Sequence, residues 1–462
     1  MKNFRRVECY SFRYEHWQKR LSDLCKTYRV PGASLAVLVD GKIHSLANGV
    51  LHKGTGVEAT TDSLFQIGSI SKVYTAILVM QLVDSGELKL NTLVKDIFPE
   101  LNIFGAEAIT IRQLFSHTSG LTSDYTIDTG RGNDCLARYV KACSDLTLDS
   151  IPGTIVSYSS VGYNVLGRIV EVVTGQSWDD ALRDRLLSPL GLTHTVTLPE
   201  EVLRFRSAMG HSGEDGQEPE PMPFWNLLPR SSGPSGGALC ATAADLVRLA
   251  QMHLEGGVTS DGTHILTDES VIAMQRLEME SPDKWTSGNE GWGLGWMIYD
   301  WGDIPVFGHD GATIGQNAYL RIAPETGVAI ALVTNGGKSN LLHSMLFQEL
   351  FWEIAGIKIP NKPFLPLPQP PTVDMTPYAG TYKRQGLDIT VLIDDNTPYL
   401  IYKTVDGRKD PAPPLKIELI PVTTTVFAGA VPGQDFIPVV FLPLQDGTIY
   451  CYLGMRAAPK IS

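Results

Sequence analysis

The feature that most constrains the fold is a pair of strand hairpins that lie far apart in the chain. The first consists of the apolar run 32–39, an Asp-Gly turn at 40–41 and a second run over 42–47. The other joins residues 318–322 to 328–333 through a Pro-Glu-Thr-Gly turn. Turn residues of this kind between apolar or β-branched runs are strong hairpin signals. We therefore predict an antiparallel sheet contributed by both ends of this unit.

Helical periodicity fills the sequence between the two hairpins. Apolar residues recur three and four positions apart in several segments, which is the spacing of one helix face. Gly86 and Gly175 follow two of these segments as stop signals. Residues 87–250 read mostly as helices and loops, so we expect a helical lobe beside the sheet and an α/β (α+β) fold. The predicted helices cover residues 11–27, 69–85, 161–174, a segment that starts at Thr242, and 341–355.

A proline-rich segment over residues 361–372 divides the chain. Such a composition is typical of a stiff spacer. After it, short apolar and β-branched runs alternate with turn residues, which predicts a small all-β domain over 373–462. The predicted organisation is thus a first domain over 1–360, a linker and a C-terminal β domain.

Composition excludes several classes of function. A net charge of −12 disfavours nucleic acid as a partner, because phosphate-binding surfaces are usually basic. The histidines and cysteines form no H-x-H, H-E-x-x-H or C-x-x-C grouping, so we expect no metal and no cofactor. The basic residues at 1–6 precede no apolar run of signal-peptide length, and no stretch of about twenty apolar residues occurs. We expect a cytoplasmic protein with free thiols and no membrane partner.

The sharpest chemical signal is a Gly-Ser-Ile-Ser-Lys run that places Ser69 three residues before Lys72. On a helix, this spacing puts both side chains on one face and within reach of each other. A serine hydroxyl needs a base, and lysine can act as one when burial lowers its pKa. The apolar and aromatic neighbours of Lys72 favour that interpretation. Taken alone, the motif also fits a helix cap at Ser69 and a solvated lysine.

Two further signals lie downstream. Tyr158 stands just before the helix predicted at 161, where a phenol can relay a proton between nucleophile and leaving group. The alternative there is a packed aromatic residue followed by a serine cap. A Gly-His-Asp-Gly run at 308–311 ends a predicted strand, and its glycines allow a substrate backbone to approach closely. The backbone N–H of Ala312 is then a candidate oxyanion donor, although an ordinary turn with an exposed histidine also fits.

In this order, the three signals resemble the class C β-lactamases, the D-alanyl-D-alanine carboxypeptidases and related esterases and acyltransferases. That family carries S-x-x-K, Y-x-N and K-T-G or H-x-G. The resemblance covers roughly residues 20–355. It implies Ser69 as nucleophile, Lys72 as general base, Tyr158 as proton relay, and an oxyanion hole formed by the N–H groups of Ser69 and Ala312. Further stretches similar to the family are Val30–Ala33, Phe65–Ser69, His117–Leu121, Gly236–Gly237 and Thr242–Leu246.

Two departures from the family pattern bear on the substrate. Ser160 stands where Y-x-N has asparagine, and its hydroxyl reaches less far than an amide. His309, followed by Asp310 and Gly311, stands where penicillin-recognising enzymes have lysine, and a histidine is only partly charged near neutral pH. We assign these four residues to substrate binding. The changes favour esters, thioesters or uncharged acyl donors over a β-lactam or a D-alanine terminus.

Three functions remain open. The first is a serine hydrolase or acyltransferase that works through an acyl-Ser69 intermediate on an ester, thioester or amide. The second, by resemblance, is a penicillin-binding-protein-type thioesterase or peptide cyclase of nonribosomal peptide pathways, with a carrier protein as a possible partner. The third is a non-catalytic sensor that is merely acylated. The substrate is expected to be a small-molecule or peptidyl acyl compound, and the sequence does not define the oligomeric state.

Other segments complete the prediction. Residues 377–382 resemble the start of the lipocalin-like domain appended to many family members. Residues 233–237 match the G-x-S-x-G nucleophile elbow, but their flanks have loop composition, which argues against an elbow. The loops 124–134 and 200–232 are candidates for the substrate rim, with surface variability as the alternative.

Overall fold

The protein is described by a computed structural model that covers residues 12–99, 101–214, 216–360, 363–405, 413–431 and 435–462. The basic residues at 1–6, Cys9 and residues 361–362 of the predicted linker lie outside the described residues. The five described cysteines, Cys25, Cys135, Cys143, Cys240 and Cys451, are free and buried. None of the helices in the described part of the chain has the length and apolarity needed to cross a membrane.

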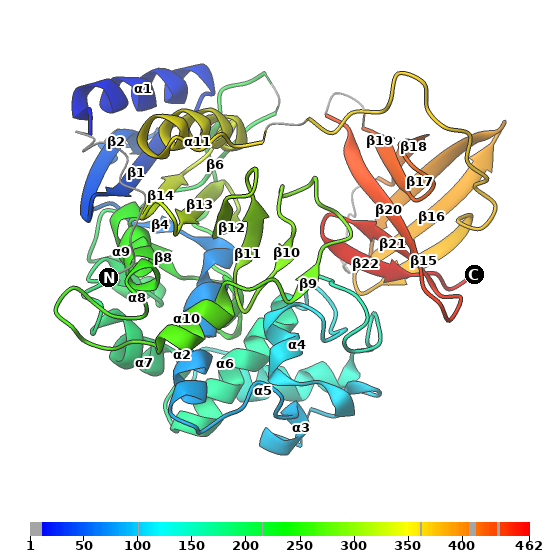
Figure 1. The fold of residues 1–462 in the computed structure, drawn as a ribbon, viewed down its shortest axis with the longest axis horizontal. Coiled ribbons are helices and arrows are strands. Elements are labelled where there is room, and N and C mark those ends of the chain that lie inside the picture. The colour runs from blue at the N-terminus through cyan, green and yellow to red at the C-terminus, as the bar shows by residue number, and fades with distance from the viewer. Residues whose placement is uncertain (1–11, 100, 215, 361–362, 406–412, 432–434) are drawn as a thin grey trace.

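A nine-stranded sheet forms the centre of the first unit, and its strands pair in the order β3-β2-β1-β14-β13-β12-β11-β10-β9 (Figure 1). Strands β1 and β14 pair antiparallel, with Ala36 opposite Ala331. The predicted sheet made from both ends of the unit, and with it the fold class, is therefore confirmed. The strands are β1 (Gly32–Val39), β2 (Lys42–His52), β3 (Val57–Glu58), β9 (Met279–Glu280), β10 (Gly291–Trp292), β11 (Met297–Asp300), β12 (Pro305–Thr313), β13 (Gln316–Ala323) and β14 (Val328–Thr334).

Helices cover both faces of this sheet. Side chains of β1 alternate between two cores, as expected for a strand buried on both sides. Leu35 and Val37 pack with α1 (Tyr14–Thr27) and α11 (Ser339–Ala355), whereas Ala36 and Leu38 belong to the core of the helical lobe. In Figure 1, α1 and α11 lie together on one side of the sheet, and the helical lobe lies on the other.

Helix α2 (Ser71–Asp84) runs through the middle of the lobe and is buried on almost all sides. A helix that is apolar all round is stable only when neighbours cover every face. The predicted helix over 69–85 is present, but it begins with a 3₁₀ turn at Gly68–Ile70. The remaining helices of the first unit are α3 (Val94–Ile97), α4 (Ile111–Phe115), α5 (Cys135–Ala142), α6 (Ser160–Thr174), α7 (Trp178–Leu182), α8 (Pro199–Val202), α9 (Ala243–Leu254) and α10 (Asp268–Met274).

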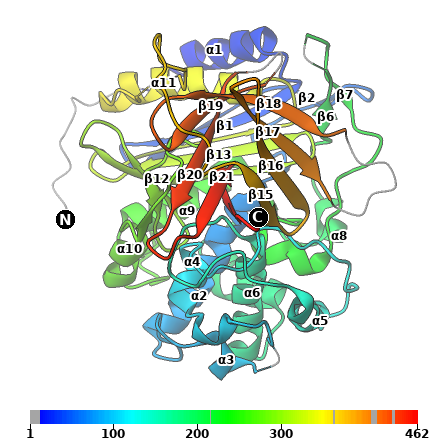
Figure 2. The ribbon, with the colours of Figure 1, turned by 90° about the vertical axis from the view of Figure 1, so that its right-hand side faces the viewer.

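A second sheet of eight strands, β15 to β22 in sequence order, forms the C-terminal β unit (Figure 2). Hydrogen bonds between Thr381 and the last two residues, Ile461 and Ser462, join its first and last edges, so the sheet closes on itself. Its apolar interior includes Tyr382, Phe427 and Phe441. The strands are β15 (Gly380–Arg384), β16 (Leu387–Asp394), β17 (Thr397–Thr404), β18 (Leu415–Pro421), β19 (Val426–Ala430), β20 (Ile437–Pro443), β21 (Ile449–Leu453) and β22 (Arg456–Pro459).

Candidate functional site

Ser69 and Lys72 lie side by side at the start of α2. The 3₁₀ turn carries Ser69, and the first turn of α2 carries Lys72, so one helical turn separates them. The Lys72 Nζ lies 3.2 Å from the Ser69 Oγ. The Lys72 side chain is 0% exposed, whereas Ser69 is half-buried and can be reached by a substrate. The serine and the lysine predicted from the motif are therefore brought into hydrogen-bonding contact.

The surroundings of Lys72 favour its neutral form. Burial lowers the pKa of Lys72 to about 7, with the Asp124 carboxylate raising it and the Arg456 guanidinium lowering it further. The ammonium donates to the Ser235 carbonyl oxygen at 2.5 Å and lies 3.5 Å from the Ser160 Oγ. An amine whose pKa lies near neutrality exists partly as a free base, which is the form that can remove a proton from a hydroxyl.

Tyr158 lies over the same pair of residues. Its ring centroid is 4.7 Å from the Lys72 Nζ, and its phenol hydrogen-bonds the Ser69 side chain. Burial raises the pKa of Tyr158 above its ordinary value of 10, so the phenol stays protonated. A protonated phenol that binds the Ser69 hydroxyl, with its ring against the Lys72 amine, is placed to take part in proton transfer at the nucleophile.

Four successive backbone N–H groups hold the Tyr158 segment in place. These bonds run from Ser157 to the His117 carbonyl at 2.8 Å, from Tyr158 to the Met455 carbonyl at 2.9 Å, from Ser159 to the His117 Nδ1 at 3.0 Å, and from Ser160 to the Ser123 carbonyl at 2.7 Å. Two parts of the chain that are remote from each other, residues 117–123 and Met455, thus fix one short segment. Sequence patterns indicated Tyr158 but not the residues that support it.

The glycines around Ser69 bring two backbone segments unusually close. A Cβ on Gly311 would lie 1.8 Å from the Ile67 carbonyl oxygen and 3.0 Å from the Ser69 nitrogen. A Cβ on Gly68 would lie 2.5 Å from the Ala312 nitrogen. Only residues without a side chain permit this approach. It places the backbone nitrogens of Ser69 and Ala312 near each other, as an oxyanion hole requires.

His309 differs from the alternative of an ordinary turn with an exposed histidine. His309 is buried, and its Nδ1 lies 2.6 Å from the Asp310 carbonyl oxygen. Burial and the nearby Lys72 charge lower the pKa of His309 to about 4, so the imidazole is neutral at neutral pH. The Asp310 carboxylate binds Arg321, with one oxygen 3.0 Å from Nη2. His309 thus carries even less charge at neutral pH than the sequence predicted, because the sequence could not show the burial of that ring.

Comparison with known proteins places this geometry in a family. A beta-lactamase family model matches residues 17–348. The chain belongs to the beta-lactamase family. The resemblance inferred from the sequence is thereby confirmed, with an all-β unit present after the matched region.

Relatives of this beta-lactamase-family chain agree with that assignment. "Penicillin-binding protein 4" of Amycolatopsis lactamdurans is 55% identical over 378 residues, which cover 81% of this chain and 99% of the relative. The crystal structure of SurE superimposes with a TM-score of 0.80 at 28% identity and covers 97% of this chain and 99% of that chain. A D-amino acid amidase from Ochrobactrum anthropi SV3, complexed with D-phenylalanine, shares the fold with a TM-score of 0.61 at 22% identity, over 73% of this chain and 98% of that chain.

An ion pair beside Tyr158 in the candidate site of this beta-lactamase-family chain was not predicted from the sequence. The Nη2 of Arg456, the first residue of β22, lies 3.1 Å from an Asp124 carboxylate oxygen. The Arg456 guanidinium carbon is also 5.3 Å from the centroid of the Tyr158 ring. Asp124 hydrogen-bonds Ser160, the residue in the asparagine position of Y-x-N. No local motif marks either charge, because folding alone brings residues 124 and 456 together.

The G-x-S-x-G segment also belongs to the site, but not as a nucleophile elbow. Ser235 lies at the end of a 3₁₀ turn, Arg230–Ser235, and its hydroxyl donates to the Ser232 carbonyl at 3.1 Å. Its backbone carbonyl receives the bond from Lys72. The segment therefore contributes a backbone acceptor that holds the lysine, a role that no side-chain pattern could reveal.

The two predicted rim loops contact each other. Arg131 in one loop binds Glu200 at the beginning of the other at 2.6 Å, and Arg230 donates to the Arg131 carbonyl at 2.6 Å. Near the end of the second loop, the Asn226 carbonyl accepts a bond from the Gln66 side chain, which immediately precedes the Ser69 turn. The loops are thus tied to the segment that carries the nucleophile candidate.

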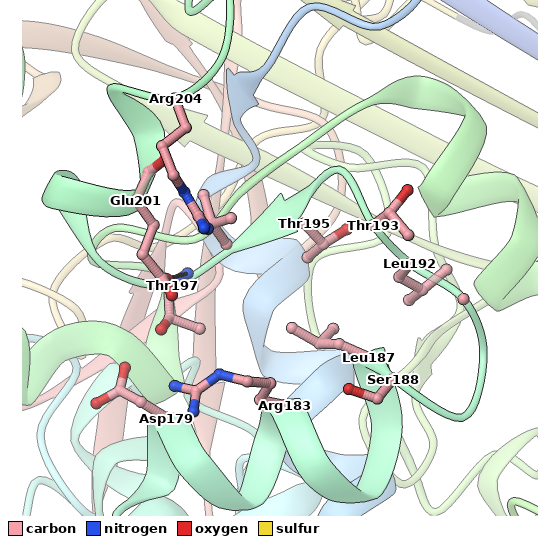
Figure 3. A pocket seen from close by; sticks show the side chains of 12 residues that line it. Asp179, Arg183, Leu187, Ser188, Leu192, Thr193, Thr195, Thr197, Glu201 and Arg204 are labelled. Carbon is pink, nitrogen blue, oxygen red and sulfur yellow. Dashed lines mark hydrogen bonds between the residues drawn. The ribbon is translucent and has the colours of Figure 1, made fainter.

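A pocket of about 190 Å³ lies elsewhere in the beta-lactamase-family domain, between α7 and the loop that carries Arg204 (Figure 3). Its charged side chains already have protein partners. Asp179 pairs with Arg230 at 2.7 Å, and Arg183 pairs with Asp180 at 2.8 Å. None of the residues that line it belongs to the Ser69 cluster. We therefore do not treat this pocket as the candidate site.

Proposed function

We propose that the protein is a serine acyl-transfer enzyme that forms an acyl-Ser69 intermediate with an ester, thioester or amide. The observation that carries this proposal is the buried Lys72 amine, which lies 3.2 Å from the Ser69 hydroxyl. A lysine with a pKa of about 7 can accept the hydroxyl proton as the Ser69 Oγ attacks the acyl carbonyl.

The remaining groups complete a balanced cycle. The backbone N–H groups of Ser69 and Ala312 stabilise the oxyanion of the tetrahedral intermediate. When the bond to the leaving group breaks, the proton taken up by Lys72 passes to that group through the Tyr158 phenol. Water or an amine then attacks acyl-Ser69 and loses its proton to the same pair of residues. As the bond between the acyl carbon and the Ser69 Oγ breaks, that proton returns to the Oγ, so the product leaves with the Ser69 hydroxyl and the neutral Lys72 restored.

The acceptor in this proposal is favoured to be an amine of a peptide, which would make the enzyme a penicillin-binding-protein-type thioesterase or peptide cyclase. Two observations support this. SurE covers 97% of this chain, and a second structure of SurE was solved with D-Leu, at a TM-score of 0.77 and 27% identity. In addition, the Asp124–Arg456 ion pair lies against the Tyr158 ring, where a substrate with an amine and a carboxyl group could exchange partners with both charges.

Intact-mass analysis after exposure to a fluorophosphonate, to β-lactams and to N-acetylcysteamine thioesters tests the chemistry. We expect a mass increase on Ser69 that is absent in Ser69→Ala. A mass increase that persists in Ser69→Ala would refute the site. Turnover separates the enzyme from an acylated sensor, because a sensor would bind one equivalent and release no product.

Product analysis with and without an amine acceptor then tests acyl transfer. A peptidyl thioester that carries a free amine should give the cyclic product, or the intermolecular amide when a second amine is supplied. If only the free acid forms under all these conditions, the protein is a hydrolase.

A further inference from the structure

His117 forms hydrogen bonds with the segment that carries Tyr158, although the two lie far apart in the sequence. Its carbonyl oxygen accepts the Ser157 N–H at 2.8 Å, and its Nδ1 accepts the Ser159 N–H at 3.0 Å. These two amides lie on either side of Tyr158. One residue therefore binds the segment both before and after the phenol-bearing residue.

The imidazole ring also packs against the phenol. The His117 ring centroid lies 4.4 Å from that of Tyr158, at an interplanar angle of 38°. The Trp292 ring lies 4.4 Å from that of His117 in an edge-to-face arrangement and 5.2 Å from that of Tyr158, so the three rings form one cluster. His117 is 1% exposed, so this stack excludes water. The backbone hydrogen bonds hold the main chain on both sides of Tyr158, and the imidazole ring limits the movement of the Tyr158 side chain.

The hydrogen bonding defines the tautomer. A backbone amide can only donate, so the Nδ1 that receives it carries a lone pair, and the neutral ring bears its proton on Nε2. The Nε2 atom has no hydrogen-bond partner among the described residues. Burial, and after it the Lys72 charge, lowers the pKa of His117 well below its ordinary value of 6.5, so the ring remains an acceptor at neutral pH.

We propose that His117 is a positioning residue that holds Tyr158 over Ser69 and Lys72, with its Nδ1 as the atom that matters. The role in catalysis rests on the proposed acyl-transfer function, whereas the positioning itself does not. His117 touches none of the atoms proposed to react, and it acts through the segment 157–159 and the phenol ring.

Three substitutions of His117 distinguish the contributions of its Nδ1, its Nε2 and its backbone. In His117→Asn, the amide oxygen occupies the place of Nδ1, and asparagine tolerates the positive φ of 57° at this position. In His117→Gln, the amide lies near the place of Nε2 instead. His117→Gly accepts the same φ without supplying an acceptor.

The first measurement is the rate at which a fluorophosphonate labels Ser69, with thermal unfolding to confirm that each variant is folded. We expect His117→Asn to remain within about threefold of the unsubstituted protein, and His117→Gln and His117→Gly to lose at least about tenfold, because a misplaced phenol slows proton transfer. If His117→Gln labels as fast as His117→Asn, the Nε2 rather than the Nδ1 is used, and the proposal is wrong.

The second measurement does not depend on activity. Deuterium uptake by the peptide that spans residues 157–160, followed by mass spectrometry, should be faster in His117→Gln and His117→Gly and close to normal in His117→Asn. Unchanged uptake in all three variants would overturn the positioning role. If the unsubstituted protein fails to label at Ser69 while the uptake pattern is as expected, the proposed function fails and the positioning role stands.

Discussion

Lys72 shows how a single residue acquires a chemical role from its place in the fold. Its ammonium lies in a helix that is buried on almost all sides, where the charged form is costly, and its hydrogen-bond partners are neutral oxygens. The Asp124 carboxylate offsets part of this cost, and the Arg456 guanidinium opposes it. The result is an amine that can change protonation near neutral pH.

The first prediction concerns pH. Lys72 must be neutral to act as a base, and its pKa is about 7. Fluorophosphonate labelling of Ser69 should therefore fall about tenfold for each pH unit below 7 and level off above it. Labelling measured from pH 5 to 9 checks this, with Lys72→Met expected to lose at least about 10³-fold. A profile that is flat between pH 5 and 8 would contradict the assignment of the base.

The second prediction uses the ion pair between Asp124 and Arg456, whose members have opposite effects on the pKa of Lys72. Removing the guanidinium in Arg456→Gln should raise the pKa of Lys72, because the Asp124 charge then acts unopposed. Asp124→Asn should lower it. The acid limb of the labelling profile should accordingly move to higher pH in Arg456→Gln and to lower pH in Asp124→Asn. If the acid limbs of the two variants moved in the same direction, these charges would not act on Lys72 as proposed.

At the scale of elements, the site depends on the close approach of β12 to the 3₁₀ turn before α2. Glycines on both sides allow that approach, and the strand pairing of β12 with β13 keeps Gly311 and Ala312 in register with Ala318 and Asn317. The end of an inner strand and the start of a helix thereby lie together at the point where the proposed oxyanion would form. Their spacing, rather than any side chain, sets the geometry.

Gly311→Ala tests this approach. The added methyl group would collide with the Ile67 carbonyl, so β12 must move away from Ser69, and labelling should fall by at least about 10²-fold as the oxyanion donor is displaced. Gly162→Ala in α6 is the control, because its Cβ would meet nothing closer than 3.6 Å. That variant should keep its labelling rate and gain about 0.5–1 kcal/mol in free energy of unfolding, since alanine is the better helix former. Equal labelling by both variants would refute the geometric argument.

Elements with strong local signals were predictable from the sequence, and contacts between remote segments were not. The Asp-Gly hairpin, the helix that ends at Gly175 and the helix capped by Thr242 are present as expected. The short strands β9, β10 and β11 were missed, because runs of two to four residues show no periodicity. Strand β19 was missed as well, since its glycine and alanines give little strand signal.

The same distinction applies to the site. The S-x-x-K spacing predicted the contact between Ser69 and Lys72, because two residues on one helix face are neighbours by geometry. Asp124 and Arg456 lie in different parts of the chain, and only the tertiary structure pairs them. The burial that lowers the pKa of His309 likewise cannot be predicted from the Gly-His-Asp-Gly run alone.

At the scale of the whole molecule, the C-terminal β unit is joined to the first unit at the centre of the site. The Met455 carbonyl accepts the Tyr158 N–H, the Ala457 N–H binds the Ser157 hydroxyl at 3.1 Å, and Arg384 donates to the Ser123 hydroxyl at 2.8 Å. The Tyr158 segment itself and Ser123, which supports it from the helical lobe, therefore both contact the second sheet. The two units behave as one structure around this residue.

Buried neutral histidines predict a loss of stability in acid. Burial lowers the pKa of His253 from 6.5 to about 3, so the unfolded chain takes up a proton below pH 6.5 that the folded chain refuses. At pH 5, which is 1.5 units below 6.5, this costs about 2 kcal/mol of free energy of unfolding at about 1.4 kcal/mol per unit. Between pH 7 and pH 5, the free energy of unfolding measured with urea should therefore fall by about 2 kcal/mol less for His253→Phe than for the unsubstituted protein. An identical loss in both proteins would show that His253 is not buried in its neutral form.

The bond from Tyr158 to Met455 has a consequence for biosynthesis. The ribosome releases Ser69, Lys72 and Tyr158 well before it has made residues 455 and 456. A nascent chain at that stage holds the serine and the lysine without the carbonyl that anchors the phenol. We expect such a chain to react poorly with acyl donors, so the newly made protein is protected from premature modification until its last strands have folded into place.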